Sequence, residues 1–228
     1  MLLKPNVLSS ACESWSKTLS SVSSLLKSCD SHFTTGRLVI LSGPSGAGKS
    51  TVVRQLIKTC QLPLVLSVSA TTRQPRPGEV DGEQYHFVSP ERFEQLRQQG
   101  AFLEFKEVFG RGHWYGTLRD KVTTGLELGK WVILEIDVQG ALSILGQEPD
   151  CLTIFLHPGG MEELERRLRD RGTESESAIE RRLEVAQQEW ELRHYYRHHV
   201  VNDSVANAVR QICNILKEYQ GPDACSKS

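Results

Sequence analysis

One segment constrains the fold of this chain more than any other: Gly43-Pro44-Ser45-Gly46-Ala47-Gly48-Lys49-Ser50. It has the form G-x-x-x-x-G-K-[ST], in which glycines let the backbone close around a phosphate and turn its N–H groups inward. The apolar run at residues 37–42 is typical of a buried parallel strand, and apolar residues at helical spacing follow the glycines. The segment therefore predicts a strand, a phosphate-binding loop and a helix whose N-terminus faces the phosphate.

Each part of this phosphate loop has an expected role toward ATP. Lys49 is placed to reach the β- and γ-phosphates, and the hydroxyl of Ser50 is placed to ligate Mg²⁺, which is the cofactor expected with ATP. The predicted ATP-binding residues of the loop are Gly43, Pro44, Ser45, Gly46, Ala47, Gly48, Lys49, Ser50 and Thr51.

Length, charge and cysteine content limit which classes of protein and partner fit this chain. The 228 residues suffice for one full domain with inserted subdomains, and a net charge of −1 gives no reason to expect a nucleic-acid or membrane partner. No apolar run approaches the roughly 18 residues of a membrane-spanning helix. The six cysteines are scattered without metal-type spacing, which is typical of reduced thiols in a cytoplasmic protein.

The first 35 residues differ from the rest because they are rich in serine and contain no arginine. We expect a disordered or weakly helical extension there. An organellar transit peptide is the alternative, but such peptides favour arginine and lack acids, whereas Glu13 and Asp30 are present. The predicted domain therefore spans residues 36–220, with 221–228 as a short tail.

Within that domain, strand-like and helix-like segments alternate. This order predicts a doubly wound, parallel α/β sheet whose ligand lies at the carboxyl ends of the strands. The run at residues 131–137 is expected to be a core strand ending in two carboxylates, Glu135 and Asp137, on the same face. Residues 117–120 loosely match a capping box at the start of a helix.

A second group of residues fits a phosphorylated acceptor. Arg73 and Arg76 lie three apart on a proline- and glycine-containing loop, and Tyr85 and Tyr115 follow. Guanidinium forks and phenol hydroxyls suit a phosphate monoester, which offers several acceptor oxygens. From the spacing alone, a basic surface loop is an equal alternative.

Longer motifs narrow this choice. The chain contains Ser69-Ala70-Thr71-Thr72-Arg73-x-Pro75-Arg76-x-Gly78-Glu79, followed by Gly82-x-x-Tyr85-x-Phe87. It also contains Phe102-Leu103-Glu104, Tyr115-Gly116-Thr117, Ile136-Asp137-x-Gln139-Gly140, Arg171-Gly172-Thr173-Glu174 and Val201-Asn202-Asp203. In these motifs and their order, about residues 36–219 resemble the guanylate kinases.

The resemblance implies ATP-dependent phosphorylation of GMP to GDP, in purine nucleotide metabolism and GMP recycling. GMP would be held in an inserted subdomain at about residues 68–118. The residues matching the family's binders of the GMP phosphate are Arg73, Arg76, Tyr85 and Tyr115, and those matching its guanine contacts are Ser69, Glu104, Thr117 and Asp137. A carboxylate such as Glu104 can accept hydrogen bonds from both N1–H and N2–H of guanine, whereas adenine presents an acceptor at N1.

The resemblance also implies a helical lid at about residues 162–190. Arg167, Arg171 and Arg182 match arginines that close on the ATP phosphates, and Asn202 matches a residue near adenine. Phosphoryl transfer needs positioning and positive charge more than a side-chain nucleophile. The predicted catalytic residues are therefore Lys49, Arg73, Arg167, Arg171 and Arg182. Other arginines of this region, Arg166, Arg169 and Arg181, are expected on a solvated face beside glutamates.

One departure and two alternatives remain. The family often has aspartate where this chain has Glu135, so a role for Glu135 in holding magnesium through water is an open expectation.

A catalytically inactive scaffold with this fold would typically lose Lys49 and the lid arginines, which are present. A kinase acting on a sugar phosphate would have no use for Glu104 as a guanine reader. A monomer and a homodimer are both compatible with the sequence.

Overall fold

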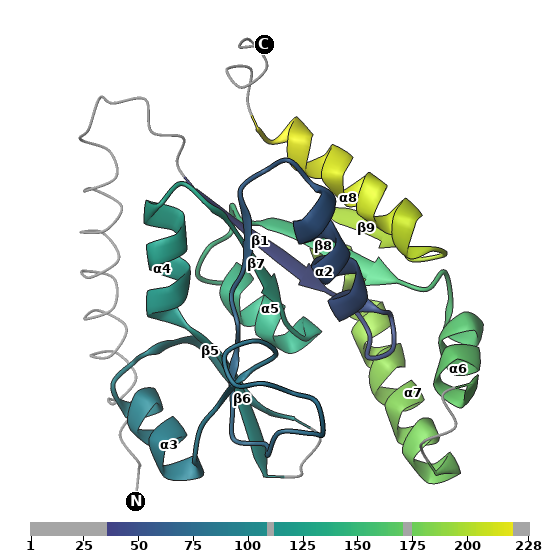
Figure 1. Ribbon diagram of the computed structural model, residues 1–228. Coiled ribbons are helices and arrows are strands. Elements are labelled where there is room, and N and C mark those ends of the chain that lie inside the picture. The colour runs from purple at the N-terminus through teal and green to yellow at the C-terminus, as the bar shows by residue number, and fades with distance from the viewer. Residues whose placement is uncertain (1–35, 109–111, 171–174, 221–228) are drawn as a thin grey trace, which may run out of the picture. The chain divides into compact units, whose positions relative to one another are not determined.

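The computed structural model describes residues 36–108, 112–170 and 175–220. Its main sheet has five strands, all parallel, in the order β2-β7-β1-β8-β9 (Figure 1). The strands are β2 (Leu64–Leu66), β7 (Trp131–Glu135), β1 (Arg37–Ser42), β8 (Leu152–His157) and β9 (His198–Val201). The parallel sheet predicted from the sequence is confirmed. The predicted extension (1–35) and tail (221–228) lie outside the described residues.

Helices cover both faces of this sheet. Helices α2 (Lys49–Thr59) and α8 (Val205–Glu218) pack on one face, and α4 (Arg119–Glu127) and α5 (Val138–Leu145) pack on the other (Figure 1). The apolar residues of β1 are buried on both faces of the sheet: Val39 and Leu41 belong to the apolar cluster on one face, and Ile40 belongs to the cluster on the other. Burial on both faces of a parallel strand is the doubly wound arrangement that was predicted.

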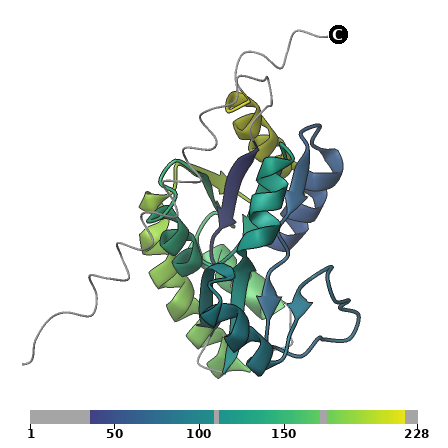
Figure 2. The ribbon, with the colours of Figure 1, turned by 90° about the vertical axis from the view of Figure 1, so that its left-hand side faces the viewer.

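A second, four-stranded sheet has the order β4-β3-β6-β5. Its strands are β3 (Ala70–Thr71), β4 (His86–Phe87), β5 (Phe102–Val108) and β6 (His113–Leu118). Helix α3 (Pro90–Gln98) packs on it through Phe93, whose ring stacks on Phe102 at 4.5 Å. In both ribbon views this sheet lies below the main sheet, on the side where β1 ends (Figure 1, Figure 2).

Two further helices follow β8. Helices α6 (Met161–Asp170) and α7 (Glu176–Glu191) share a small apolar cluster built on Leu164, Leu168 and Ile179, and the short 3₁₀ helix η1 (Leu192–Tyr195) leads to β9. Arg166 and Arg169 pair with glutamates on the exposed side of α6, as expected. Within the described residues, no helix has both the length and the apolar character needed to cross a membrane.

Two local predictions were wrong. Strand β7 ends at Glu135, and Asp137 is the N-cap of α5, where its Oδ1 accepts a hydrogen bond from the N–H of Gly140 at 2.7 Å. The two carboxylates therefore do not share a strand face. Helix α4 begins after Leu118 without a side-chain cap, because the Thr117 hydroxyl donates across the sheet to Glu104 instead.

Candidate active site

The phosphate loop joins β1 to α2 and depends on glycine at positions with left-handed backbone. Gly43 has φ 139° and Gly48 has φ 87°. A Cβ at Gly43 would lie 2.0 Å from the carbonyl oxygen of Leu156, and one at Gly48 would lie 2.6 Å from Nδ2 of Asn202. Both the backbone conformation and the lack of space therefore exclude a side chain at these two positions. Glycine there allows the loop to take the shape in which its N–H groups and the N-terminus of α2 can bind a phosphate.

Lys49 is folded back over this loop. Its Nζ donates to the carbonyl oxygens of Gly43 at 2.7 Å and Pro44 at 3.2 Å. Burial lowers the pKa of Lys49, while the nearby carboxylates of Glu189 and Glu135 act in the opposite direction. The ammonium group thus lies at the loop, bound to neutral carbonyls that it can exchange for phosphate oxygens.

Ser50 and Glu135 meet beside the loop. The pairing of Leu41 with Glu135 brings the end of β7 next to the end of β1, and Ser50 Oγ donates to Glu135 Oε1 at 2.5 Å. No group of three or more His, Cys, Asp or Glu side chains that could hold a metal occurs among the described residues. A hydroxyl and one carboxylate nevertheless fit Mg²⁺, since this ion keeps several waters and takes phosphate oxygens as further ligands.

Two predicted lid arginines reach toward the loop, Arg182 from α7 directly and Arg167 from α6 through Asn202. Arg182 Nη2 donates to Ser45 Oγ at 2.7 Å, and Arg167 Nη2 donates to the carbonyl oxygen of Asn202 at 2.8 Å. Asn202 is buried, and its Nδ2 donates to the carbonyl oxygen of Ala47 at 2.7 Å, so it supports the loop from within. Thr51 is exposed on α2. Arg171 lies outside the described residues.

Four residues of the predicted phosphate clamp lie on or beside the second sheet. Arg73 Nε donates to the hydroxyl of Tyr115 at 3.2 Å, and its guanidinium lies 5.4 Å from the ring centre of Tyr85. The rings of Tyr85 and Tyr115 are 5.5 Å apart. Arg76 is exposed on the same loop as Arg73. The structure thus gathers Arg73, Tyr85 and Tyr115 into one cluster, with Arg76 beside it.

The predicted guanine contacts form a second cluster. Glu104 and Thr117 are partners across β5 and β6, and Thr117 Oγ1 donates to Glu104 Oε1 at 2.7 Å. Glu104 is only 9% exposed, and burial raises its pKa to about 7, with the Asp137 carboxylate adding to the rise and the Thr117 hydrogen bond opposing it. Ser69 directly precedes β3, whose Ala70 pairs with Gly116. Glu104, Thr117 and Asp137 therefore lie close together, and Ser69 lies at the start of β3 in the same sheet as Glu104 and Thr117.

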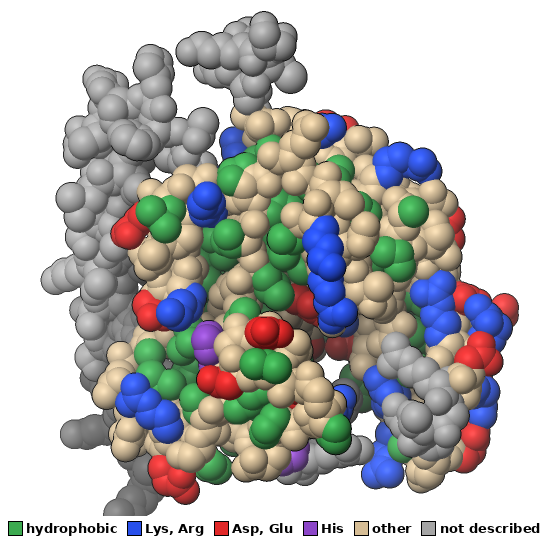
Figure 3. Space-filling view, in the orientation of Figure 1, with side chains coloured by type: hydrophobic (Ala, Val, Ile, Leu, Met, Phe, Trp, Pro, Cys, Tyr) green, Lys and Arg blue, Asp and Glu red, His purple; other side chains and the backbone are tan. Residues whose placement is uncertain are grey.

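Each cluster lies near a carboxylate at the end of β7 or just after it: the phosphate clamp near Glu135 and the base cluster near Asp137. Burial raises the pKa of Tyr85, and the negative charge of Glu135, at the end of the main sheet, adds to the effect. The space-filling view shows a hollow between the second sheet and the α6–α7 pair, with acidic side chains inside it (Figure 3). A donor and an acceptor nucleotide can therefore approach each other in this hollow.

Comparison with known proteins identifies the family. The guanylate kinase family model matches residues 35–219. The chain belongs to the guanylate kinase family. A guanylate kinase of Rhodopirellula baltica is 58% identical over 203 residues, which cover 88% of this chain and 97% of the relative. A guanylate kinase of Caldanaerobacter subterraneus subsp. tengcongensis is 46% identical over 181 residues, which cover 79% of this chain and 86% of the relative. A solved guanylate kinase from Anaplasma phagocytophilum has a TM-score of 0.67 and 33% identity, covering 82% of this chain and 87% of its own. Family membership makes the chain a kinase, an enzyme of the transferase class.

Two carboxylates that lie against residues of the candidate site were not predicted from the sequence. Glu79 binds the Arg73 guanidinium through both oxygens, at 2.9 and 3.0 Å, and accepts from the backbone N–H of Arg76. Glu189, on α7, is half-buried near Lys49 and near the backbone N–H of Ser45, and its partial burial raises its pKa. Glu79 stands inside the quoted motif, and Glu189 follows Arg182 by seven residues, so it lies on the same helix face; both could have been found from these spacings.

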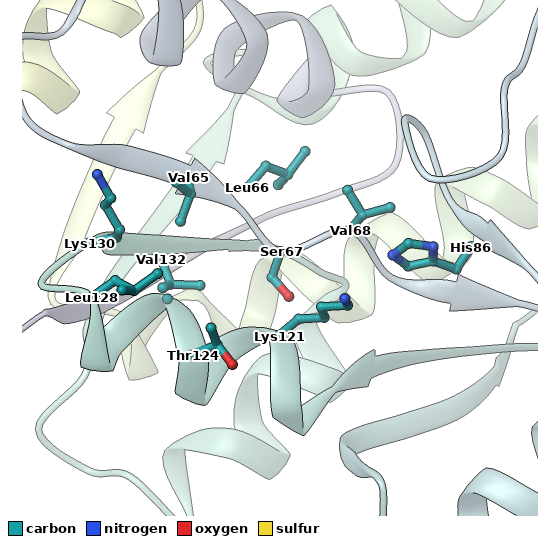
Figure 4. A pocket seen from close by; sticks show the side chains of 11 residues that line it. Val65, Leu66, Ser67, Val68, His86, Lys121, Thr124, Leu128, Lys130 and Val132 are labelled. Atoms are coloured by element: carbon teal, nitrogen blue, oxygen red, sulfur yellow. The ribbon is translucent and has the colours of Figure 1, made fainter.

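A separate groove lies away from both clusters. It has a volume of about 340 Å³ and runs between β2, β7 and α4, with Val65, Val132 and Leu128 among its apolar lining (Figure 4). It contains none of the residues predicted to bind ATP or GMP, so it has no part in the site described above.

Proposed function

We propose that this chain transfers the γ-phosphoryl group of ATP to GMP and releases ADP and GDP. The buried pair of Glu104 and Thr117, next to Asp137, is the observation that carries this proposal. Two carboxylates with a hydroxyl between strands complement the paired N–H donors and the O6 acceptor of guanine. Its membership of the guanylate kinase family supports the same assignment.

On the donor side, the loop N–H groups and Lys49 bind the β- and γ-phosphates of ATP. An oxygen of the GMP phosphate attacks the γ-phosphorus in line, the bond from that phosphorus to the bridging oxygen breaks, and ADP leaves. The enzyme contributes position and positive charge, so no covalent intermediate with a side chain is required. The arginines that supply charge are Arg73, Arg167, Arg171 and Arg182.

On the acceptor side, one cluster holds the phosphate and the other holds the base. Glu79 keeps the guanidinium of Arg73 oriented before GMP arrives, because it binds both of its terminal nitrogens. The residues proposed to bind the GMP phosphate are Arg73, Arg76, Tyr85 and Tyr115, and those proposed to bind guanine are Ser69, Glu104, Thr117 and Asp137. Asn202 acts on the ATP side by supporting the loop at Ala47.

Ser50 and Glu135 are proposed to hold Mg²⁺, Glu135 through a water molecule. Bound there, the ion neutralises phosphate charge during transfer. The longer side chain of Glu135 reaches Ser50 directly, which supports its use in place of the more usual aspartate.

We further propose that the enzyme works in the cytoplasm, in purine nucleotide metabolism and GMP recycling, without a nucleic-acid or membrane partner. The free thiols of Cys60, Cys151 and Cys213 fit a reducing compartment. Residues 36–220 are proposed to be the catalytic unit, with the acceptor insert at about 68–118 and the lid at about 162–190. It works as a monomer or a homodimer.

A coupled assay of ADP formation tests this function. The full chain, ATP and Mg²⁺ are combined with GMP, AMP, UMP or a sugar phosphate. We expect turnover with GMP at a kcat/KM at least about a hundredfold above the other acceptors, since a site built to accept two N–H donors leaves buried groups unpaired with adenine. Preferred turnover of the sugar phosphate would contradict the proposal, and absence of any turnover would indicate a scaffold.

A further inference from the structure

Lys106 occupies a position in the acceptor site to which no role has been assigned. On β5 it pairs with Tyr115 of β6, just as Glu104 pairs with Thr117 two residues earlier. Residues two apart on a strand point to the same face. Lys106 therefore stands on the acceptor face between the base cluster and the phosphate clamp.

The partner of Lys106 lies on the main sheet's side of the site. Its Nζ is 3.0 Å from Oδ2 of Asp137, while Oδ1 of Asp137 caps α5 through the N–H of Gly140. Both oxygens of Asp137 are thus engaged, one by the helix N-terminus and one by the ammonium group. The pair is 42% and 31% exposed, so a bound nucleotide can share it.

A second carboxylate lies next to this pair. A Cβ placed on Gly140 would be 2.9 Å from Oε2 of Glu104 and 3.3 Å from Oδ1 of Asp137, so both carboxylates border the same small space. The negative charge of Asp137 disfavours ionisation of the buried Glu104. The groups that face Glu104 are the Thr117 hydroxyl from β6, Asp137 from the start of α5 and Lys106 from β5, and among these Lys106 supplies the positive charge.

We propose that Lys106 is a specificity-determining residue of the acceptor site, because its ammonium group keeps Glu104 in the charged form that accepts hydrogen bonds from guanine. This inference rests on the proposed function. Ionised Glu104 offers two acceptors to N1–H and N2–H of guanine. Protonated Glu104 offers one donor and one acceptor, which suits N1 and N6–H of adenine instead. Lys106 thereby favours GMP over AMP.

The test compares the pH dependence of kcat/KM for GMP and AMP in the wild-type enzyme and Lys106→Met. Burial already holds the pKa of Glu104 at about 7, and loss of the lysine raises it further. A rise of one unit would lower the ionised fraction at pH 7 from about one half to about one tenth, so we expect Lys106→Met to lose about fivefold in kcat/KM for GMP at pH 7. The loss should disappear above about pH 9, and AMP turnover should not fall in parallel.

Two controls separate charge from structure. Lys106→Arg keeps the charge and should retain the wild-type pH profile. Lys121→Met removes a positive charge from the exposed side of α4, outside the site, and should also leave the profile unchanged. Calorimetric titration with GMP in two buffers of different ionisation enthalpy adds a readout without turnover: Lys106→Met should release more protons per GMP at pH 7.5 than the wild type.

The outcomes distinguish the two proposals. If the wild-type enzyme phosphorylates GMP but Lys106→Met shows a pH-independent loss, or an unchanged ratio of GMP to AMP turnover, the role of Lys106 is overturned and the proposed function stands. If the wild-type enzyme neither binds nor phosphorylates GMP, both fall.

Discussion

The proposed donor and acceptor sites of this molecule are built by different means. The donor site is made largely of backbone: six consecutive residues, 43–48, connect β1 to α2, and glycines at Gly43 and Gly48 exclude side chains. The acceptor site is made of side chains from segments as far apart as Ser69 and Asp137. Its charged groups are already paired without a ligand, Arg73 with Glu79 and Lys106 with Asp137.

The two ways of building a site suit two different tasks: backbone suits the binding of phosphate, and side chains suit the recognition of a base. Backbone N–H groups have no protonation state and bind any polyphosphate alike. A buried carboxylate such as Glu104 can read a base, but its ionisation then depends on its neighbours. We conclude that substitutions in the donor site should lower turnover of all acceptors equally. Substitutions in the acceptor site should lower turnover to an extent that depends on the base of the acceptor and on pH.

The largest effect is expected from Lys49→Met. It removes the positive charge at the loop, and loss of such a charge in phosphoryl transfer typically lowers kcat by about a hundredfold to ten-thousandfold. The loss should be the same for GMP and IMP, and KM for GMP should change little. Steady-state kinetics with both acceptors measures this. A loss confined to one acceptor would break the proposed division between the two sites.

A smaller effect is expected from Glu135→Gln. The neutral amide still reaches Ser50 but attracts Mg²⁺ less, so we expect kcat to fall at least about tenfold and the magnesium concentration for half-maximal rate to rise. A magnesium titration at fixed ATP measures both. An unaltered titration would assign Glu135 a structural role only.

Within the acceptor site, the base cluster and the phosphate clamp should differ in how their carboxylates make stability depend on pH. The folded protein raises the pKa of Glu104 from 4.5 to about 7, so the stability that its protonated form contributes is complete below pH 4.5 and is lost as the pH rises to about 7. Glu104→Gln should therefore stabilise the fold at pH 8 by on the order of 3 kcal/mol relative to its effect at pH 4. Denaturant unfolding at both pH values measures the difference.

Glu79→Gln is the matched control with the opposite sign. The hydrogen bonds from Arg73 lower the pKa of Glu79, so its contribution is present above pH 4.5 and is lost as the pH falls below that value. This variant should destabilise the fold at pH 8 and have less effect at low pH. Equal pH dependence in the two variants would contradict the account of the acceptor charges.

The smallest effect is expected from removing the N-terminal extension. The family model begins at residue 35, so a chain starting at Thr34 should fold and retain its kcat and melting temperature. Thermal unfolding and the coupled assay check this. A drop of several degrees or a large fall in kcat would make residues 1–33 part of the enzyme.

The sequence predicted the donor site better than the acceptor site for a physical reason. The phosphate loop is contiguous, so its residues and its β1–α2 context follow from local patterns. Asp137 was expected on a strand face, but a strand that enters a helix needs an N-cap, and the carboxylate serves that need. Thr117 was expected to cap a helix, yet the buried Glu104 opposite it on β5 requires a donor.

Ion pairs between residues far apart in the chain could not be predicted from the sequence. The contact of Lys106 with Asp137 joins β5 to the start of α5, which only the packing of the fold brings together. Local patterns carry no information on such long-range ion pairs. The parallel sheet and its helices, by contrast, follow from apolar runs that must be buried on both faces.

Base selection by Glu104 is the central claim, and Glu104→Gln with GMP and IMP tests it most directly. A charge-assisted hydrogen bond contributes roughly 1.5–3 kcal/mol, so kcat/KM for GMP should fall at least about tenfold. IMP lacks the N2 amine and should lose less, whereas Arg76→Ala should penalise both acceptors alike because they carry the same phosphate. If Glu104→Gln left GMP turnover within about twofold, or reduced GMP and IMP equally, Glu104 would not be the guanine reader.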